Sequence, residues 1–341
     1  MQGASVRWML GLCTAILVAA ALSAAQPVLA PVVFAIFTIA LVWPVQVTLQ
    51  RRIPKLVALL ATTALALGAL AVLALVILWA FGSVGTWIVA NAAELTLLYQ
   101  QKVAWLEARG IPVAGVIGTF DPRRAVGIAQ RVLAQLQGTL TFLLLTLVFV
   151  ALGLAEVDVA RRQLERRGEG VPAALLRAAR RSAGKFRTYM MVRTIMSMLT
   201  GLVVWAFAKV IGLELAAEWG AIALVLNYIP FIGPLVATLF PTTFAILQFG
   251  EWQAALTVFV VLQVVQSVGG SAIEPWLTGA RLAVSPFMVL LAVFLGSLLW
   301  GIQGAFIGVP VLIGALVLCE EFPASRWVAE LLSGRDGPLP R

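Results

Sequence analysis

Residues 224–244 read LVLNYIPFIGPLVATLFPTTF. The segment is apolar enough for a membrane helix, yet it contains Pro230, Pro234 and Pro241. Proline lacks a backbone N–H and its ring clashes with the preceding turn, so a continuous helix is not expected here. Irregular backbone at membrane depth is tolerated where it is buried in protein or lines an aqueous cavity. We therefore expect a discontinuous or re-entrant segment, with a kinked helix packed against its neighbours as the alternative.

The composition around this segment is that of a membrane protein. Of 341 residues, 62% are hydrophobic and 11% are charged, and the mean hydropathy is +1.01. A soluble domain carries roughly a quarter charged residues. The chain has no histidine and two cysteines, which argues against zinc sites and histidine-dependent catalysis. We expect an all-α polytopic membrane protein with about eight transmembrane helices, and no enzyme activity, metal or cofactor.

The first part of the chain, residues 1–81, is expected to hold three transmembrane helices, at about 8–22, 28–49 and 56–81. Residues 82–138 are less hydrophobic, and charged residues there alternate with regularly spaced Leu, Val and Ile. This pattern predicts an amphipathic helical region outside the cytoplasm. It is either a lid or oligomer contact, or a connector on the bilayer surface.

Two breaks divide this amphipathic region. Gly110-Ile111-Pro112 is expected to end its first helix. Asp121-Pro122 supplies an N-cap and a first helical residue for the second helix, which we expect to continue into the fourth span.

Basic residues set the predicted orientation. Residues 139–211 contain spans four and five, and between them the segment 156–187 holds nine Lys and Arg against four acids. Short basic loops stay in the cytoplasm, so this segment is predicted to be a cytoplasmic loop and both chain termini to be cytoplasmic. The net charge of +9 is explained by this topology, and no nucleic acid partner is expected. Arg193, one turn inside the fifth span, is expected to snorkel to the cytoplasmic interface.

Residues 212–319 form the expected transport core, because their apolar segments are interrupted by Gly and Pro, and residues 320–341 form a cytoplasmic tail. One interruption is GGSAIEP, residues 269–275. The apolar block 285–319 is 35 residues long, whereas about 20 cross a bilayer, so it must bend or re-enter. Besides the break at 227–234, the expected structural breaks are Pro241, Pro275, Pro286, Gly301, Gly304, Gly308 and Pro310.

The candidate solute path consists of polar side chains in or beside these breaks, together with the Pro and Gly residues around which backbone carbonyls are freed. They are Asn227, Tyr228, Pro230, Gly233, Pro234, Gln263, Gln266, Ser271 and Gln303, with Thr242 and Thr243 as further hydroxyl groups. Glu274 is the one acid set in a Gly-rich break between two strongly apolar segments. Ionisable groups at membrane depth usually mark substrate or proton paths, so Glu274 is the candidate for ion coupling. It precedes a proline, so a loop position or a structural ion pair is the alternative.

Three segments carry a resemblance to a known family. NYIPFIGPLVA at 227–237, IEPWLTG at 273–279 and SPFMVLLAVFLGSLLWGIQGAFIGVP at 285–310 resemble the AI-2E family, the autoinducer-2 exporter family of bacterial permeases. The resemblance implies eight spans, a location in the bacterial inner membrane and transport of a small solute. Some members are associated with export of autoinducer-2 and others with sodium/proton exchange. Ser271 stands where the family often has asparagine, which puts a ligand contact at that position in doubt.

The leading hypothesis is an inner-membrane permease that moves a small polar solute resembling autoinducer-2, in the export direction and without ATP hydrolysis. One alternative is a sodium/proton antiporter that uses Glu274 to exchange a monovalent cation for a proton. Another is a non-transporting scaffold or passive pore. The expected partners are the solute or cation, membrane lipid and further copies of the chain in a homo-oligomer.

Overall fold

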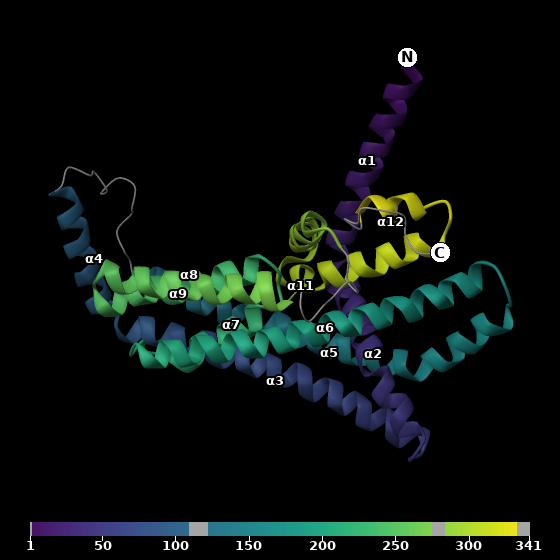
Figure 1. Ribbon diagram of the computed structural model, residues 1–341, viewed down its shortest axis with the longest axis horizontal. Coiled ribbons are helices and arrows are strands. Elements are labelled where there is room, and N and C mark those ends of the chain that lie inside the picture. Colours follow the sequence, from purple (N-terminus) through teal and green to yellow (C-terminus); the bar gives the residue numbers. More distant parts are fainter. Residues whose placement is uncertain (1, 109–121, 275–283, 333–341) are drawn as a thin grey trace. The chain divides into compact units, whose positions relative to one another are not determined.

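The computed structural model describes residues 2–108, 122–274 and 284–332, and every regular element in these ranges is a helix (Figure 1). In chain order the helices are α1 (Gln2–Ala24), α2 (Gln26–Gln50), α3 (Lys55–Ala90), α4 (Ala92–Glu107), α5 (Pro122–Arg166), α6 (Val171–Val210), α7 (Ala216–Leu226), α8 (Ile232–Phe249), α9 (Trp252–Val268), the π-helical turn η1 (Gly269–Ile273), α11 (Pro286–Glu321) and α12 (Arg326–Leu332). α5 begins at Pro122, where the sequence predicts a first helical residue, and runs without interruption into the fourth apolar segment. The Gly110-Ile111-Pro112 break and Pro275 lie outside the described residues.

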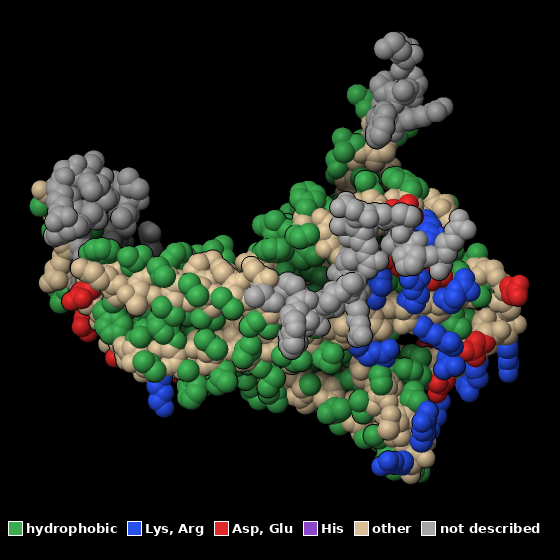
Figure 2. Space-filling model, viewed as in Figure 1, with side chains coloured by type: hydrophobic (Ala, Val, Ile, Leu, Met, Phe, Trp, Pro, Cys, Tyr) green, Lys and Arg blue, Asp and Glu red, His purple; other side chains and the backbone are tan. Residues whose placement is uncertain are grey.

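The described helices have the lengths and surfaces of membrane spans. Seven of them are long and apolar enough to cross a bilayer, and Met9–Ala24 and Ala216–Leu226 are shorter apolar helices. Large hydrophobic side chains lie on the outside of these helices and cover much of the visible surface (Figure 2). In water such a surface would aggregate, whereas lipid solvates it. The expected all-α polytopic membrane architecture is confirmed.

The chain divides into two compact units. Unit 1 comprises Met1–Ala69, Thr141–Met191 and Thr278–Arg341, and unit 2 comprises Leu70–Leu140 and Val192–Leu277. The long helices α3, α5 and α6 each contribute to both units.

In unit 2, α7 and α8 form an antiparallel helical hairpin. Trp219 near the start of α7 packs on Phe244 near the end of α8, with 5.1 Å between the ring centroids. At the open end, the side chain of Gln248 accepts a hydrogen bond from the Glu214 N–H at 2.8 Å and donates one to the Gly212 carbonyl at 2.9 Å. The apolar segment that contains Pro230, Pro234 and Pro241 is therefore two helices folded back on each other.

The tip of this hairpin is a tight reversal. The N–H of Ile232 donates to the Pro230 carbonyl at 2.7 Å, which makes a γ-turn centred on Phe231 with φ 62° and ψ −54°. Turns of this type are rare and strained in non-glycine residues. A Cβ atom on Gly233 would collide with the Leu226 carbonyl, so only glycine allows α8 to start so close to the end of α7. Pro241, in contrast, is not a break, because α8 is continuous through it, as neighbouring groups permit in membrane helices.

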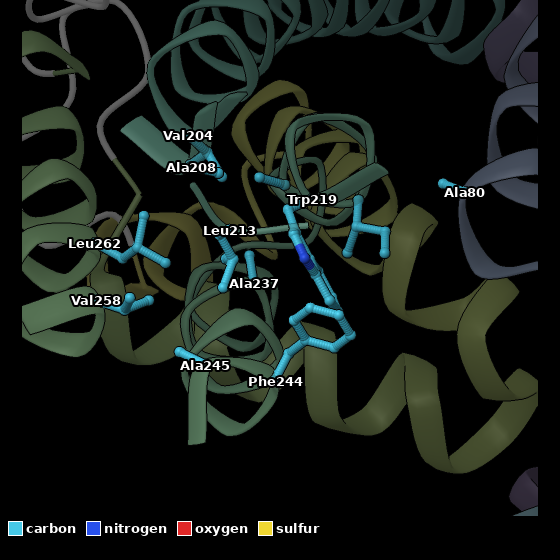
Figure 3. Packing of buried hydrophobic residues seen from close by; sticks show 12 residues of the cluster. Ala80, Val204, Ala208, Leu213, Trp219, Ala237, Phe244, Ala245, Val258 and Leu262 are labelled. Carbon is cyan, nitrogen blue, oxygen red and sulfur yellow. The ribbon is translucent and has the colours of Figure 1, made fainter. Parts of the chain in front are cut away.

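A buried apolar core holds the hairpin in unit 2 (Figure 3). Its buried members come from α3, α6, the Leu213 turn, α7, α8 and α9: Ala80, Val204, Ala208, Leu213, Trp219, Ile222, Ala223, Ala237, Phe244, Ala245, Val258 and Leu262. α6 and α7 are in close contact at Gly201 and Gly220, where a Cβ on either glycine would lie 2.8 Å from the carbonyl oxygen of the other. The hairpin is thus packed tightly against α6.

In unit 1, α11 is also a hairpin, made of two helical halves. The chain reverses at Trp300 (φ −134°, ψ 22°) and Gly301 (φ 59°, ψ −141°). After the reversal, Gly304 lies against the Gly296 carbonyl and Gly308 against the Ala292 carbonyl, so closely that an added Cβ would collide. The 285–319 block therefore folds back on itself.

The breaks expected in this block lie differently from the prediction. Only Gly301 is a break inside α11, because it takes a positive φ that favours glycine. Gly304, Gly308 and Pro310 were expected to break the helix but lie within its second half, where the two glycines provide a close helix contact. Pro286 is the first residue of α11, a position that suits proline.

The α11 hairpin is fixed at both ends. At the reversal, the Trp300 indole N–H donates to the Leu22 carbonyl at 2.9 Å, and the Gln26 amide donates to the Trp300 carbonyl at 3.3 Å. The last two residues of α11, Glu320 and Glu321, form ion pairs with basic residues of α6. The distances are 2.8 Å for Arg181–Glu320, 2.6 Å for Arg181–Glu321, 3.1 Å for Arg177–Glu321 and 3.1 Å for Lys185–Glu320.

The basic segment 156–187, expected to be a loop, is mostly helical. α5 continues to Arg166 and α6 starts at Val171, so only four residues connect them. Figure 2 shows Lys and Arg side chains gathered where these two helices meet. The segment has low hydropathy because the ends of these two helices carry many charged residues. Low hydropathy predicts that a segment is exposed to solvent, but an exposed segment can still be helical.

The contact between the two halves of α11 predicts that Gly304→Ala is destabilising. The new Cβ must displace backbone, and such overpacking costs about 1–3 kcal/mol, so the thermal unfolding midpoint in detergent should fall. Gly314→Ala is the matched control, since a Cβ there meets nothing within 4 Å. Equal midpoints for the two variants would contradict the hairpin.

The ion pairs at the end of α11 predict a salt-dependent loss of stability in the double variant Glu320→Gln, Glu321→Gln. The two carboxylates are only 13% and 9% exposed, whereas their arginine partners are half exposed or more, so we expect the midpoint to fall by about 2–4 °C. The difference from wild type should shrink in 1 M salt, where the screening length is about 3 Å. Glu330→Gln is the control, because its 3.7 Å pair with Arg326 is exposed. An equal loss in this control would show that the α11 pairs have no special role.

Candidate functional site

Polar side chains of unit 2 gather at the tip of the α7–α8 hairpin. We call them the tip cluster: Arg193, Thr194 and Ser197 from α6, Asn227 and Tyr228 from the hairpin tip, and Glu274 from the residue after η1. These residues come from three separate segments of the chain. The tip cluster is therefore a product of the fold and not of one sequence motif.

Hydrogen bonds fasten the tip to α6. The Asn227 amide donates to the Ser197 hydroxyl at 3.5 Å, and the Tyr228 hydroxyl donates to the Thr194 hydroxyl at 3.0 Å. Ser197 is fully buried and Asn227 is 5% exposed. Polar groups in such surroundings are stable only when hydrogen-bonded, so these contacts determine where the tip sits on α6.

An ion pair joins α6 to the end of η1. Arg193 Nη2 lies 2.9 Å from Glu274 Oε1, and the two side chains are 10% and 29% exposed. From the sequence, Arg193 is expected to snorkel to the cytoplasmic interface. In the structure its side chain is buried and paired with a carboxylate that hydropathy alone does not associate with it.

Local geometry explains why these groups meet. Arg193 and Ser197 are four residues apart, so they lie on one face of α6. η1 contains a wide turn in which the Glu274 N–H donates to the Gly269 carbonyl five residues before it. Gly269 packs against Met196 of α6, where an added Cβ would lie 3.2 Å from the methionine methyl group. π-Helical turns of this kind are frequent at functional sites.

Only part of the expected solute path belongs to the tip cluster. Asn227 and Tyr228 are in it, and Pro230, Gly233 and Pro234 shape the hairpin that carries it. Gln263 and Ser271 are exposed and Gln266 is half-buried, and none of the three contributes a contact that defines the cluster.

The remaining expected path residues have other places. The hydroxyls of Thr242 and Thr243 donate to carbonyls of their own helix, at 2.8 and 2.9 Å. Gln303 belongs to unit 1, in the second half of α11.

Thr194 and Ser197 are not among the site residues predicted from the sequence. The available signal was their position, because four polar residues lie within one otherwise apolar stretch of the fifth span: Arg193, Thr194, Ser197 and Thr200.

Within residues 2–108, 122–274 and 284–332, no group of three or more Cys, Asp or Glu side chains is arranged to hold a metal ion. The chemistry that the tip cluster offers is hydrogen bonding and a balanced pair of charges.

Comparisons with known proteins agree with this architecture. A family model described as AI-2E family transporter matches residues 12–324. The chain is 30% identical over 217 residues to the AI-2 transport protein TqsA of Escherichia coli K12, covering 63% of this chain and 62% of TqsA. It is also 27% identical over 192 residues to YhhT, a protein of the same organism that is named for a proposed transport role. This match covers 56% of this chain and 54% of YhhT.

These two matches span less than two thirds of the relatives' own lengths. A protein of Haemophilus influenzae, also named for a proposed transport role, matches at 24% identity over 345 residues and 96% of both chains. The family model covers all but the two ends of the sequence. The chain therefore belongs to the AI-2E family of transporters.

Proposed function

We propose that this protein moves a small, neutral, hydroxyl-rich solute out of the cell across the bacterial inner membrane, without ATP hydrolysis. The observation that carries the proposal is the tip cluster. It brings together an amide, three hydroxyls and an ion pair of zero formal charge from three segments of the chain that are mostly apolar. Such groups can replace the hydration of a neutral polyol one hydrogen bond at a time, whereas they offer no net charge to attract an ion.

The solute class follows from this chemistry and from the relatives. The name of TqsA assigns transport of AI-2 to that protein. A molecule resembling autoinducer-2 has hydroxyl groups, which can exchange hydrogen bonds with the side chains of the tip cluster. The sequence contains no phosphate-binding glycine loop, which supports movement driven by a gradient.

A substitution at the tip tests the proposal. Asn227→Ala removes the amide that bonds Ser197, and losing one buried hydrogen bond of about 1–3 kcal/mol should reduce solute efflux on the order of 10-fold. Efflux is measured from proteoliposomes loaded with an autoinducer-2-like polyol. Thr257→Ala is the control, because that exposed hydroxyl bonds only the Gln253 carbonyl of its own helix in the described structure. Wild-type efflux in Asn227→Ala would contradict the proposed path.

Sodium/proton exchange is the second candidate, and the position of Glu274 favours it. Its carboxylate lies in the tip cluster and is the more exposed partner of its ion pair. If this activity is present, a sodium gradient should change the pH inside vesicles with wild-type protein and not with Glu274→Gln. No pH change in the wild type would exclude exchange, and an unchanged signal in the variant would exclude Glu274.

Saturation separates transport from a passive pore or scaffold. A carrier has a limited number of sites, so efflux should reach a maximum as the internal solute concentration rises. Flux that rises linearly would indicate a pore, and no flux for any solute would indicate a scaffold.

A further inference from the structure

We propose that Arg162 and Arg166 of α5 bind the phosphate of an anionic phospholipid whose acyl chains lie along the same face of the helix. Both arginines belong to unit 1. The tip cluster belongs to unit 2, so this lipid contact uses no residue of the tip cluster.

The two arginines continue a stripe of exposed apolar side chains on α5. The stripe consists of Leu144, Val148, Leu152 and Val159. Arg162 follows Val159 by three residues, Arg166 follows Arg162 by four, and both arginines are exposed. Intervals of three, four and seven residues keep side chains on one face of an α-helix. The guanidinium groups therefore end a face of α5 whose apolar side chains suit contact with acyl chains.

A different face of α5 packs against the protein. A second series with the same spacing runs along this face: Val150, Leu154, Asp158, Arg161 and Glu165. Val150 and Leu154 are fully buried. The charged members of the packed face are therefore turned toward other helices of the protein.

The carboxylates of the packed face already have basic partners. Glu165 Oε1 lies 2.9 Å from Arg161 Nε and 2.9 Å from Arg180 Nη2 of α6. Asp158 Oδ2 lies 3.2 Å from Lys55 Nζ of α3. Within the residues that the structure describes, Arg162 and Arg166 take part in no ion pair. Their guanidinium groups are thus available to a phosphate from outside the protein.

The length of α5 places the two arginines at the depth of the lipid headgroups. The apolar span covers Thr141–Arg166, which is 26 residues. With Thr141 at one edge of the hydrocarbon, a rise of about 1.5 Å per residue puts Arg162 about 32 Å and Arg166 about 38 Å along the helix. The hydrocarbon is about 30 Å thick and the headgroups extend the bilayer to about 40–45 Å. Both guanidinium groups then lie just outside the hydrocarbon.

Arginine is well suited to a phosphodiester. Its planar set of N–H donors contacts two phosphate oxygens at once, and it stays charged at any physiological pH. Side chains four residues apart on a helix are separated by about 5–6 Å at Cβ, so Arg162 and Arg166 can reach the same phosphate. A basic residue near an anionic membrane surface strengthens binding about five-fold. Phosphatidylglycerol offers this phosphate with one negative charge.

The experiment titrates phosphatidylglycerol into purified full-length protein in neutral detergent. Binding is followed as the rise of the thermal unfolding midpoint, measured by the fluorescence of the 11 tryptophans. In the double variant Arg162→Gln, Arg166→Gln the lipid concentration for half of the effect should increase on the order of 30-fold. The matched control is Arg161→Gln, Arg180→Gln, which removes the same charge from the same end of α5 but from the packed face. It should keep the wild-type concentration within about two-fold.

Two further compounds separate the headgroup from the acyl chains. Phosphatidylcholine with the same acyl chains has no net charge, and glycerophosphoglycerol has the same phosphate without acyl chains. At the concentration at which phosphatidylglycerol has half of its effect, neither should change the midpoint. A full response to glycerophosphoglycerol would show that a free phosphate ester is sufficient and would overturn the lipid assignment.

Three other results overturn the proposal. They are a wild-type protein that does not respond to phosphatidylglycerol, an equal response to phosphatidylcholine, and an equal loss in the two double variants, which would indicate a diffuse positive field. The substituted arginines are all exposed, so the variants should fold. If the double variant at Arg162 and Arg166 does not accumulate, Arg166→Gln alone decides, with an expected increase of about five-fold.

Discussion

Every peptide group inside a bilayer must find its hydrogen-bond partner within the protein, and this constraint shapes the whole molecule. Long uninterrupted helices satisfy it, and they make up most of the described chain. Two reversals interrupt the helices of the apolar core segments, one at Phe231 and one at Trp300–Gly301. Each reversal has a backbone carbonyl that accepts a hydrogen bond: the Pro230 carbonyl from the Ile232 N–H, and the Trp300 carbonyl from the Gln26 amide.

The two reversals are stabilised by different means. At Phe231 the turn is closed by its own backbone and fixed to α6 by the side chains of Asn227 and Tyr228. At Trp300 the turn is fixed to the α1–α2 connection through an indole and a glutamine amide. The polar side chains at both reversals therefore hold irregular backbone in place. Those of the tip cluster have, in addition, the chemistry to bind a solute.

Much of the architecture could be predicted from the sequence, because apolar length and proline position are local properties. Pro230 and Pro234 predicted a break where the α7–α8 tip lies, and the length of 285–319 predicted a second one. The partners could not be predicted. Arg193 meets a carboxylate 81 residues further along the chain, and hydropathy describes depth but not neighbours. Likewise, Gly304 and Gly308 were expected to break the helix, and the sequence does not show that they contact the other half of α11 instead.

Gln248 shows how one side chain can imitate a peptide unit. Its amide accepts from the Glu214 N–H and donates to the Gly212 carbonyl, as a neighbouring strand would. Among the side chains, only amides present an acceptor and a donor in this fixed planar arrangement. The hairpin thus begins with a substitute for a two-bond ladder, supplied from α8 across the open end. Glutamate has the same shape but carries no N–H, so the chain at Gly212 would lose the donor that aligns it with α8.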